Sequence, residues 1–397
     1  MSETNLTDHA EGGQQAQDPT DVLRVENLTK IYPDGTLAVD DISFSIKEGD
    51  FCVVIGPSGC GKSTTLHSLV GKIKPTEGRV ILDGKDITNK PTYQRDIGLV
   101  FQDFQLFPHL TVAENVTYGP KRMKLPEATI DERLENVLEM MQLHELRDRQ
   151  PRELSAGQKQ RVALARSLVL EPKLLLLDEP LGDMDYKLQK RMERELLRIH
   201  RELDTTFVYV THDQTQAMRL ADQIIVMNGG KIEHSGPVDE VYNRPNTAFV
   251  AAFVGDSNLF DGELVGLSAD ETRATIKTAL GEFAVSTENL DSEPSSLVGK
   301  RVPFAVRPQY VRLDSTAENT LDCEVQDVLY QSGSGTQMIL HATTESGTSE
   351  EIQLKSDDRL TVDGDRVTVG WDAGDTIILE RTSVLPDVDL ETDILGK

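Results

Sequence analysis

A glycine-rich loop at residues 56–63 constrains the fold of this chain more than any other feature, because it reads Gly-Pro-Ser-Gly-Cys-Gly-Lys-Ser. An apolar, partly β-branched run at residues 51–55 precedes the loop and is typical of a strand buried on both faces. After the loop, apolar residues recur at helical spacing: Leu66, Leu69, Val70 and Ile73. A strand that passes through such a loop into a helix is the context of a phosphate-binding loop, which predicts an α/β fold with a mainly parallel sheet.

The loop predicts a binding site for a nucleoside triphosphate. Its glycines let backbone N–H groups curl around an anion, and the N-terminus of the following helix adds partial positive charge. Lys62 is expected to reach the β- and γ-phosphates, and the Ser63 hydroxyl to hold Mg²⁺. The alternative is an ordinary glycine-rich turn. The loop residues expected to contact the nucleotide are Gly56, Pro57, Ser58, Gly59, Cys60, Gly61, Lys62, Ser63 and Thr64.

Two further apolar runs end in residues suited to phosphate chemistry. Residues 174–177 are four leucines that precede Asp178 and Glu179, and the run 206–211 precedes His212. Ligands of open α/β sheets lie at the carboxyl ends of the strands, so all three side chains are expected beside the phosphates. Asp178 suits Mg²⁺ coordination, Glu179 suits activation of a water, and His212 suits contact with the γ-phosphate. A solvated acidic turn is the alternative for the Asp-Glu pair.

A short pattern about 90 residues after the loop, Leu154-Ser155-Ala156-Gly157-Gln158, restricts the class further. It is expected to open a helix from Gln158 onward, whose N-terminal amides can meet an anion. With this pattern, residues 22 to about 255 resemble the nucleotide-binding subunit of ATP-binding cassette transporters. The family signature is Leu-Ser-Gly-Gly-Gln, and Ala156 stands at its first glycine.

The resemblance implies ATP and Mg²⁺ as ligands and assigns residues to them. Tyr32 matches the aromatic residue that stacks on adenine. Gln102 matches the glutamine that touches Mg²⁺ and senses the membrane partner. The implied metal ligands are therefore Ser63, Gln102 and Asp178.

The resemblance also implies the catalytic residues. Glu179 matches the catalytic carboxylate, His212 the switch histidine, and Asp185 the aspartate of the loop that follows the carboxylate; Gln102 is grouped with them. Residues 181–185 read Leu-Gly-Asp-Met-Asp in place of the commoner Leu-Ser-Ala-Leu-Asp. The missing serine hydroxyl affects the expected signalling across the dimer, although Asp185 is retained.

The signature further implies a homodimer, because in the family the signature of one subunit closes over the ATP of the other. Here that contact would come from Ser155, Ala156, Gly157 and Gln158. The family pair works beneath two transmembrane permease subunits that are fed by an extracellular solute-binding protein. A helix-rich insert, residues 103 to about 165, would face the permease. Five apolar residues near its start could form the groove that receives the permease. The alternative is that they belong to the internal core of the insert, which we expect for at least half of them. They are Phe101, Phe104, Leu106, Phe107 and Leu110.

Residues 256–397 show short alternating runs, such as 302–306, separated by Gly, Asp, Ser and Pro, and predict a small β-barrel. They resemble the oligonucleotide-binding-like (TOBE) domain of the importer subgroup, with Arg307-Pro308 at a family landmark. In related importers this domain stabilises the dimer and can also bind regulators or substrate. The predicted organisation is thus a disordered acidic tail at 1–21, an ATPase domain at 22–255 and an all-β domain at 256–397.

The cargo is indicated by two short segments only. Residues 185–192 and 253–260 look most like those of spermidine/putrescine importer ATPases. Sugar, ferric-iron and anion importers share nearly all other features, so they remain alternatives. A soluble ATPase that remodels nucleic acid, ribosomes or a protein partner is the alternative from another class.

Charge is unevenly distributed in the chain. The formal net charge is −26, and residues 256–397 hold 28 acids against 11 bases, a net charge of −17. Such acidity argues against nucleic-acid binding. Adaptation to a salt-rich cytoplasm, as in halophilic archaea, is one explanation, and a merely acidic mesophilic protein is the other.

No apolar run approaches a membrane span and no secretory signal opens the chain, so we expect it at the cytoplasmic face of the membrane, attached only through the permease. The three cysteines have neither metal nor redox spacing, which predicts no zinc site and no disulfide. Because Cys60 lies inside the phosphate loop, maleimide is expected to inactivate the protein and ATP to protect it.

Overall fold

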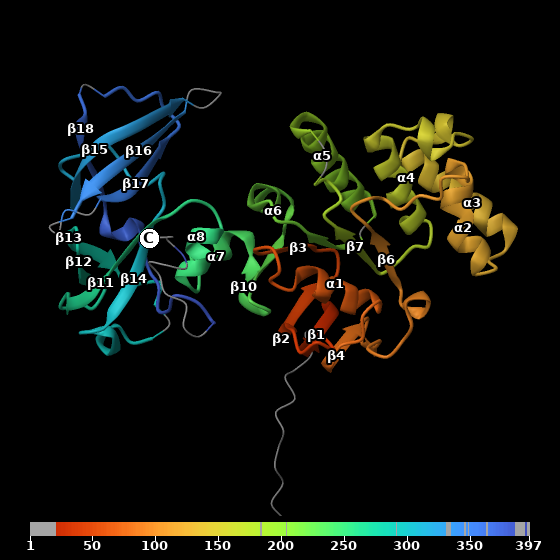
Figure 1. Cartoon of the computed structure of the whole chain (residues 1–397), viewed down its shortest axis with the longest axis horizontal. Coiled ribbons are helices and arrows are strands. Elements are labelled where there is room, and N and C mark those ends of the chain that lie inside the picture. Colours follow the sequence, from red (N-terminus) through yellow and green to blue (C-terminus); the bar gives the residue numbers. More distant parts are fainter. Residues whose placement is uncertain are drawn as a thin grey trace, which may run out of the picture.

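The computed structural model of the 397-residue chain describes residues 21–182, 185–203, 205–290, 292–330, 335–344, 347, 349–362, 364–385 and 394 (Figure 1). All but the last residue of the predicted acidic tail lies outside the described residues. Among the described residues, no helix has both the length and the apolar character that crossing a membrane requires.

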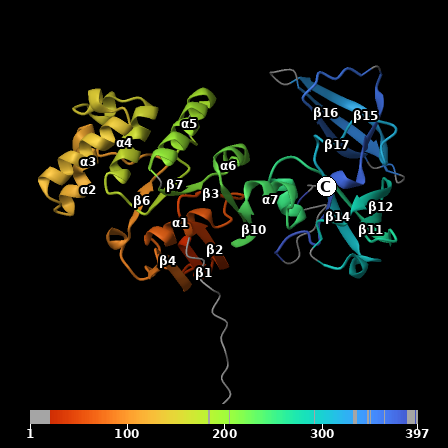
Figure 2. The same cartoon turned by 180° about the vertical axis from the view of Figure 1, so that it is seen from behind.

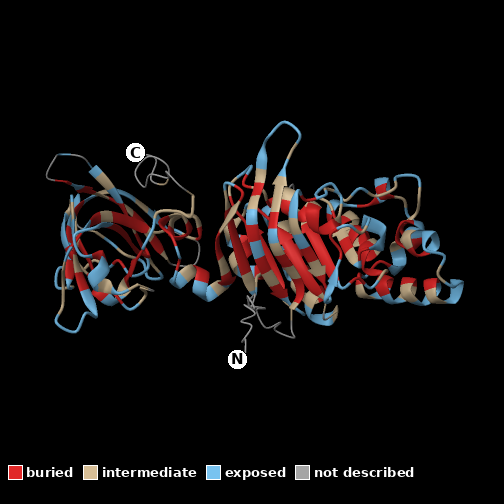
Figure 3. Cartoon of the chain, turned by 90° about the horizontal axis from the view of Figure 1, so that it is seen from below, coloured by how far each residue is buried: buried red, intermediate tan, exposed pale blue. Residues whose placement is uncertain are grey.

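The N-terminal half is built on a six-stranded sheet. Its strand order is β10 (Lys231–Pro237), β9 (Gln223–Asn228), β3 (Phe51–Ile55), β8 (Thr206–Val210), β7 (Leu174–Asp178) and β6 (Ile97–Val100). The inner pairs are parallel, and only β10 pairs antiparallel. Every residue of β3 and β8 is buried, as expected for strands covered on both faces. Figure 3 shows many buried residues gathered in the strands near the middle of the molecule. The predicted α/β class is confirmed.

A second, antiparallel sheet covers part of this core. Its order is β2 (Leu37–Lys47), β1 (Asp21–Ile31), β4 (Glu77–Leu82) and β5 (Lys85–Asp86). Helix α1 (Lys62–Val70) lies between the two sheets, because Leu66 and Leu69 belong to one apolar cluster with β1 and with one face of β3.

The remaining helices of this half pack mainly on the other face of the large sheet. They are α2 (Val112–Arg122), α3 (Glu127–Met140), α4 (Ala156–Leu168), α5 (Tyr186–Leu203), α6 (Gln214–Leu220), α7 (Val238–Asn243) and α8 (Ala248–Phe253). Short 3-10 turns occupy Thr92–Gln94, His144–Leu146 and Pro151–Glu153. Figures 1 and 2 show α2, α3 and α4 grouped at one end of the molecule. These helices fall mostly within residues 103–165, the range predicted for the helix-rich insert.

The C-terminal half is all-β, as predicted. One sheet has the order β13 (Gly281–Ser286), β12 (Arg273–Thr278), β11 (Asn258–Leu267), β14 (Arg301–Val306) and β19 (Thr376–Ile378). The other has the order β17 (Ser349–Ser356), β16 (Thr336–Thr343), β15 (Asn319–Tyr330) and β18 (Arg366–Trp371). Both contribute to one core, in which the ring of Phe260 stacks on Phe304 at 4.9 Å and on Trp371 at 5.4 Å. Further 3-10 turns lie at Pro294–Leu297 and Ala373–Asp375.

Arg307 joins the two halves. Its side chain is 1% exposed and donates to the carbonyl oxygens of Ala251 at 3.0 Å and Val254 at 2.9 Å, at the end of α8. Its guanidinium also lies 4.1 Å from the ring centre of Tyr242 in α7. A buried guanidinium is costly unless its donors are satisfied, and here both terminal nitrogens donate while the buried Nε finds no partner among the described residues. The bonds of the terminal nitrogens favour one arrangement of the junction.

Candidate functional site

The glycine-rich loop links β3 to α1, as the sequence predicts. Gly61 has φ +104°, and a Cβ built there would lie 2.5 Å from the carbonyl oxygen of Ala38. Gly59 has φ +82° and faces open space, with no atom within 4 Å of its would-be Cβ. One glycine therefore lets the loop pass close to its neighbours, and the other leaves its outer face bare for a ligand.

Lys62 is held inside the loop. It is 7% exposed, and its Nζ donates to the carbonyl oxygens of Gly56 at 2.7 Å and Pro57 at 2.9 Å. These hydrogen bonds compensate the ammonium for the water it lacks. Ser63, the next residue, is exposed. The loop thus places the held ammonium of Lys62 next to the exposed residue Ser63, an arrangement that fits a bound polyphosphate.

Tyr32 lies at the far end of the loop. Its hydroxyl is 3.2 Å from Oγ1 of Thr64, and the Lys30 ammonium is 5.4 Å from its ring centre. The ring is only half-buried, so it can accept a flat partner. The predicted aromatic residue and the predicted loop are therefore adjacent.

Asp178 and Glu179 lie at the carboxyl end of β7. Burial, with the neighbouring Glu179 carboxylate, raises the pKa of Asp178, while His67, whose Nε2 is 3.9 Å from Asp178 Oδ2, opposes the rise. Glu179 has φ +44°, an unusual conformation for a residue with a side chain, and its N–H donates to the Val210 carbonyl oxygen at 3.0 Å. The sequence did not single out His67.

His212 follows β8, the strand beside β7. Its Nδ1 lies 3.2 Å from Glu179 Oε2. Gln102 and Glu179 both lie beside Gly182, because a Cβ built there would be 3.6 Å from Gln102 Nε2 and 3.9 Å from Glu179 Oε2. The structure therefore brings Gln102, Glu179 and His212, from three separate segments, into one neighbourhood.

Asp185 has a local role that the sequence did not reveal. Its Oδ1 accepts a hydrogen bond from the N–H of Leu188 at 3.0 Å, the contact of a residue that caps helix α5. Residues 183–184 of this loop lie outside the described residues, so the effect of the missing serine stays a prediction.

The signature residues open helix α4 two residues earlier than predicted, at Ala156 and not at Gln158. Ser155 is the reason, because its Oγ accepts from the Gln158 N–H at 3.4 Å while the Ser155 N–H donates to Gln158 Oε1 at 2.8 Å. A crevice of about 180 Å³ beside these residues is also lined by Arg161 and Arg191.

Signature and phosphate loop pack on opposite faces of the large sheet. Alternate residues of β3 show this, since Val53 packs in the cluster that holds α4 while Val54 packs in the cluster that holds α1. Within one chain, the sheet therefore separates the helix that the signature opens from the phosphate loop.

The loop after β6 contains the residues that the sequence placed near a docking groove. The expectation that at least half of them are internal core is wrong: all five are half-buried, and only Phe104 and Leu106 pack on the main core. Phe107 instead contacts the exposed ring of Tyr118 at 4.5 Å.

Arg166 and Asn115 hold this loop, and sequence reasoning missed both. Phe104 and Gln105 have φ +60° and +44°, and Arg166 of α4 donates to their carbonyl oxygens at 2.9 Å and 2.7 Å. Buried Asn115 accepts from the Phe107 N–H at 2.8 Å. An isolated Arg or Asn in a helix carries no sequence signal for such a contact.

Cys60 is less reactive than the sequence suggested. Its thiol is 3% exposed, and burial raises the pKa of that thiol. Thiolate is the reactive form, so rapid inactivation by maleimide is no longer expected.

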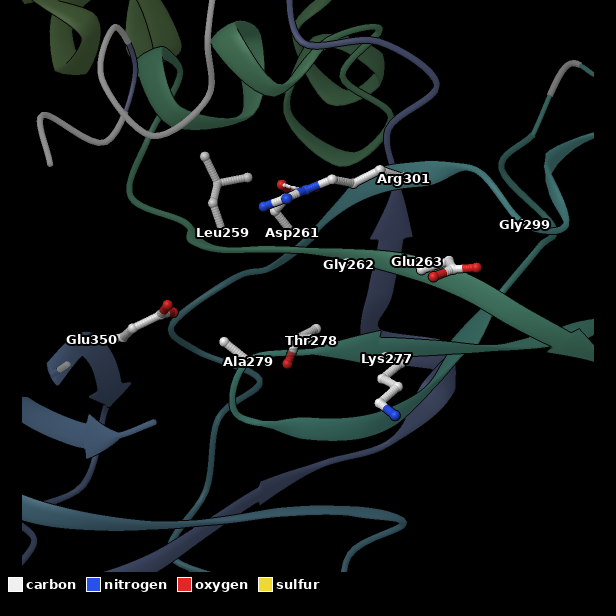
Figure 4. Close-up of a pocket in the computed structure, with 10 residues that line it drawn as sticks. All are labelled: Leu259, Asp261, Gly262, Glu263, Lys277, Thr278, Ala279, Gly299, Arg301 and Glu350. Atoms are coloured by element: carbon white, nitrogen blue, oxygen red, sulfur yellow. Dashed lines mark hydrogen bonds and ion pairs between the residues drawn. The ribbon is translucent and has the colours of Figure 1, made fainter. Parts of the chain in front are cut away.

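Figure 4 shows a different pocket, of about 430 Å³, in the C-terminal half. Asp261 pairs there with Arg301, and Glu263 lies opposite Lys277 in the register of β11 and β12. Its lining residues come from the β domain, so it is not part of the site at the phosphate loop.

Within the described residues, no group of three or more His, Cys, Asp or Glu side chains forms a metal cage. A magnesium ion that shares its ligands with phosphates needs no such cage. Exposed Ser63 and the carboxyl-end residue Asp178 are the oxygen donors that fit it.

Comparison with known proteins agrees with this geometry. The model of the ABC transporter family matches residues 39–182, and that of the TOBE domain matches residues 304–379. A spermidine/putrescine import ATP-binding protein of Rubrobacter xylanophilus is 40% identical over 96% of this chain and 99% of its own. A putrescine transport ATP-binding protein of Escherichia coli is 39% identical over 91% and 95%. Among solved structures, cbiO1 of Clostridium perfringens, part of an ABC transporter complex, has a TM-score of 0.53 at 37% identity, over 56% of this chain and 90% of that one.

The chain is therefore an ATP-binding cassette ATPase and belongs to the ABC transporter family. Within that family it belongs, over nearly its whole length, with the import ATP-binding proteins that carry a C-terminal TOBE domain.

Proposed function

We propose that the chain is the ATP-hydrolysing subunit of an importer for polyamines, with spermidine and putrescine as the first candidates. The proposal rests chiefly on the Glu179–His212 contact of 3.2 Å, because these residues follow β7 and β8 at the same edge of the sheet where β3 leads into the phosphate loop. The cargo is inferred from the near full-length relatives, which are named as spermidine/putrescine and putrescine transport proteins.

In this proposal each site residue acts on ATP at a stated place. Tyr32 stacks on adenine, the loop 56–64 cradles the phosphates, and Lys62 leaves its loop carbonyls to contact the β- and γ-phosphates. Glu179 accepts the proton of the attacking water, and His212 steadies that carboxylate and the γ-phosphate. Mg²⁺, held by Ser63, Gln102 and Asp178, would supply charge neutralisation at the phosphates.

The active form is proposed to be a homodimer. The signature residues Ser155, Ala156, Gly157 and Gln158 lie at the start of α4, which packs on the opposite face of the sheet from α1 and the phosphate loop, so the signature of a second copy is the natural partner for a bound γ-phosphate. Asp185 is proposed to lie near the dimer axis, where a change in the cap of α5 would pass between subunits.

Two permease subunits and an extracellular binding protein complete the proposed importer, which places the chain at the cytoplasmic face of the membrane. The loop 101–110, whose five apolar residues are half-buried, is the proposed docking surface, since it contains Gln102 of the site near one end. No nucleic-acid role is proposed, because the net charge is −26. We also propose that residues 22–255 form the ATPase domain and residues 256–397 the all-β domain. The acidity of the chain is proposed to reflect a halophilic origin.

The decisive experiment is affinity purification of Glu179→Gln protein with MgATP and high KCl from gently solubilised native membranes. Recovery of a permease pair supports the importer, and its binding protein is then titrated with spermidine, putrescine, a sugar, ferric iron and an oxyanion. Tight binding of a sugar, iron or anion in place of the amines would overturn the cargo. Recovery of soluble partners alone would favour a remodelling ATPase.

A further inference from the structure

The chain returns from the β domain to the ATPase domain after its last strand. We call residues 379–385 the return segment. It leaves β19 with the Leu379 N–H bonded to the Pro303 carbonyl oxygen at 2.8 Å. Its carbonyl oxygens at Arg381 and Thr382 then accept from the N–H groups of Ala248, at 3.1 Å, and Phe249, at 2.9 Å. These are first-turn groups of α8, which need partners from outside the helix.

Glu233 on β10 anchors the return segment. Its side chain is buried, at 2% exposed, and its Oε2 accepts from the Val384 N–H at 3.0 Å and from Thr247 Oγ1 at 3.0 Å. Its Oε1 accepts from Asn228 Nδ2 at 3.1 Å and from the Ser383 hydroxyl. A buried carboxylate is tolerated only with such donors, so loss of the return segment would leave it short of two of them.

Leu385 then rests on the turn between β9 and β10. A Cβ built on Gly229 would lie 2.7 Å from Leu385 Cδ1, so the leucine side chain occupies the space above a bare Cα. Gly229 and Gly230 have φ +50° and +85°. Two adjacent glycines lose much conformational entropy when they are ordered, and the leucine offsets part of that loss by packing.

The same turn supports the phosphate loop. The Gly230 N–H donates to the Cys60 carbonyl oxygen at 3.1 Å, and the Gly230 carbonyl oxygen accepts from the Asp40 N–H at 2.9 Å. The Met227 carbonyl oxygen would lie 2.2 Å from a Cβ on Gly56, so the end of β9 presses directly on the loop. A continuous series of contacts therefore runs from the β domain, through Leu385 and the turn, to Cys60.

We propose that Glu233 and Leu385 are positioning residues of the ATP site, through which the β domain sets the conformation of the phosphate loop. The proposal rests on the proposed nucleotide-binding role of that loop and adds a route of control to it. A change in the β domain that moves the return segment away would remove the support of the Gly229–Gly230 turn. The fraction of molecules whose phosphate loop has the ATP-binding conformation would then fall. ATP and the return segment would then favour the same conformation.

The test compares Leu385→Ala and Glu233→Gln with wild type in the full-length protein. The equilibrium Kd for a fluorescent ATP analogue, and the KM and kcat for MgATP, are measured. We expect Kd and KM to rise by a factor of about 3 to 10 and kcat to change less than about twofold, since a smaller competent fraction weakens binding without touching the chemistry. The matched controls are Leu329→Ala, 43% exposed on β15, and Glu240→Gln, 55% exposed beside β10.

Unchanged Kd and KM in both variants would overturn the proposal. Failure of the wild-type protein to bind the analogue would overturn the proposed function instead, so the two outcomes are distinct. If Glu233→Gln does not fold, the double variant Ser383→Ala/Leu385→Ala replaces it, because both residues are only half-buried. Hydrogen exchange is then expected to quicken at residues 56–61 and 227–231 and to stay as in wild type at β15 and β16. Unchanged exchange at 56–61 would contradict the route.

Discussion

His212 Nδ1 lies 3.2 Å from Glu179 Oε2, although 33 positions separate the two residues in the chain. The contact arises because β7 and β8 are adjacent and parallel, with Asp178 in register with Val210, so both side chains follow their strands at the same edge. The Glu179 N–H also bonds to the Val210 carbonyl oxygen. Carboxylate and imidazole are thus placed by the sheet and are expected to act as one unit.

A double-mutant cycle tests this unit. Glu179→Gln should lower kcat by a factor of about 100 or more while ATP still binds, because the group that takes the proton is lost. His212→Ala should also lower kcat, and the double variant should be no slower than Glu179→Gln alone, since residues that act together give non-additive losses. Steady-state ATPase assays measure all four proteins. Losses that multiply would contradict the unit, and Glu127→Gln/His109→Ala, both exposed, is the control.

Removal of the Arg166 guanidinium should release the loop after β6. Arg166→Met loses two hydrogen bonds to the left-handed residues Phe104 and Gln105, which should cost about 1–3 kcal/mol of unfolding free energy. Chemical denaturation measures the loss. The exposed Arg152→Met is the control. A loss in Arg152→Met as large as that in Arg166→Met would show that the loop contacts are not the cause.

Native protein should react slowly with maleimide. Cys52, Cys60 and Cys323 are all buried, and burial raises the pKa of each thiol. Mass spectrometry should find far fewer labels on the native chain than the three taken up after urea unfolding. Fast labelling of Cys60 would mean that the loop opens in solution, and MgATP should then slow it.

Stability should fall in mild acid through His234. This side chain is 2% exposed, and burial lowers the pKa of its imidazole while Glu240, at 4.0 Å, partly opposes the shift. The folded state therefore favours neutral histidine, so the unfolded chain takes up the proton first as the pH falls, and stability is lost below the unfolded-state pKa. Thermal midpoints at about pH 7.5 and about pH 5.5 should differ less in His234→Asn than in wild type. Equal differences would contradict this, and exposed His109→Asn is the control.

Salt should stabilise the β domain in particular. Its net charge of −17 lies over residues 256–397, and added KCl shortens the Debye length from about 10 Å at 0.1 M to about 3 Å at 1 M. Trp371, the only tryptophan, is fully buried in that domain, so its fluorescence reports β-domain unfolding. The midpoint temperature of unfolding, followed by Trp371 fluorescence, should rise with KCl and not with sorbitol of equal osmolarity. A flat response would favour the merely acidic mesophile.

The candidate residues of the proposed nucleotide site could be named from the sequence because their signals are local. The loop 56–63 depends on backbone conformations that glycine adopts at fixed spacing, whereas the signature 154–158 was named through the family resemblance. The mainly parallel sheet was predictable too, since uninterrupted apolar runs such as 51–55 are typical of strands covered on both faces.

Contacts between distant segments were decided by the tertiary structure alone. Three contacts join segments far apart in the chain. They are the hydrogen bonds from Arg166 to the carbonyl oxygens of residues 104–105, the bond between the Gly230 N–H and the Cys60 carbonyl oxygen, and the packing of Leu385 against Gly229. The sequence around a single arginine, glycine or leucine does not indicate which distant residue it will contact. The partner is chosen when packing brings buried polar groups and bare glycine faces together, where each must find a contact.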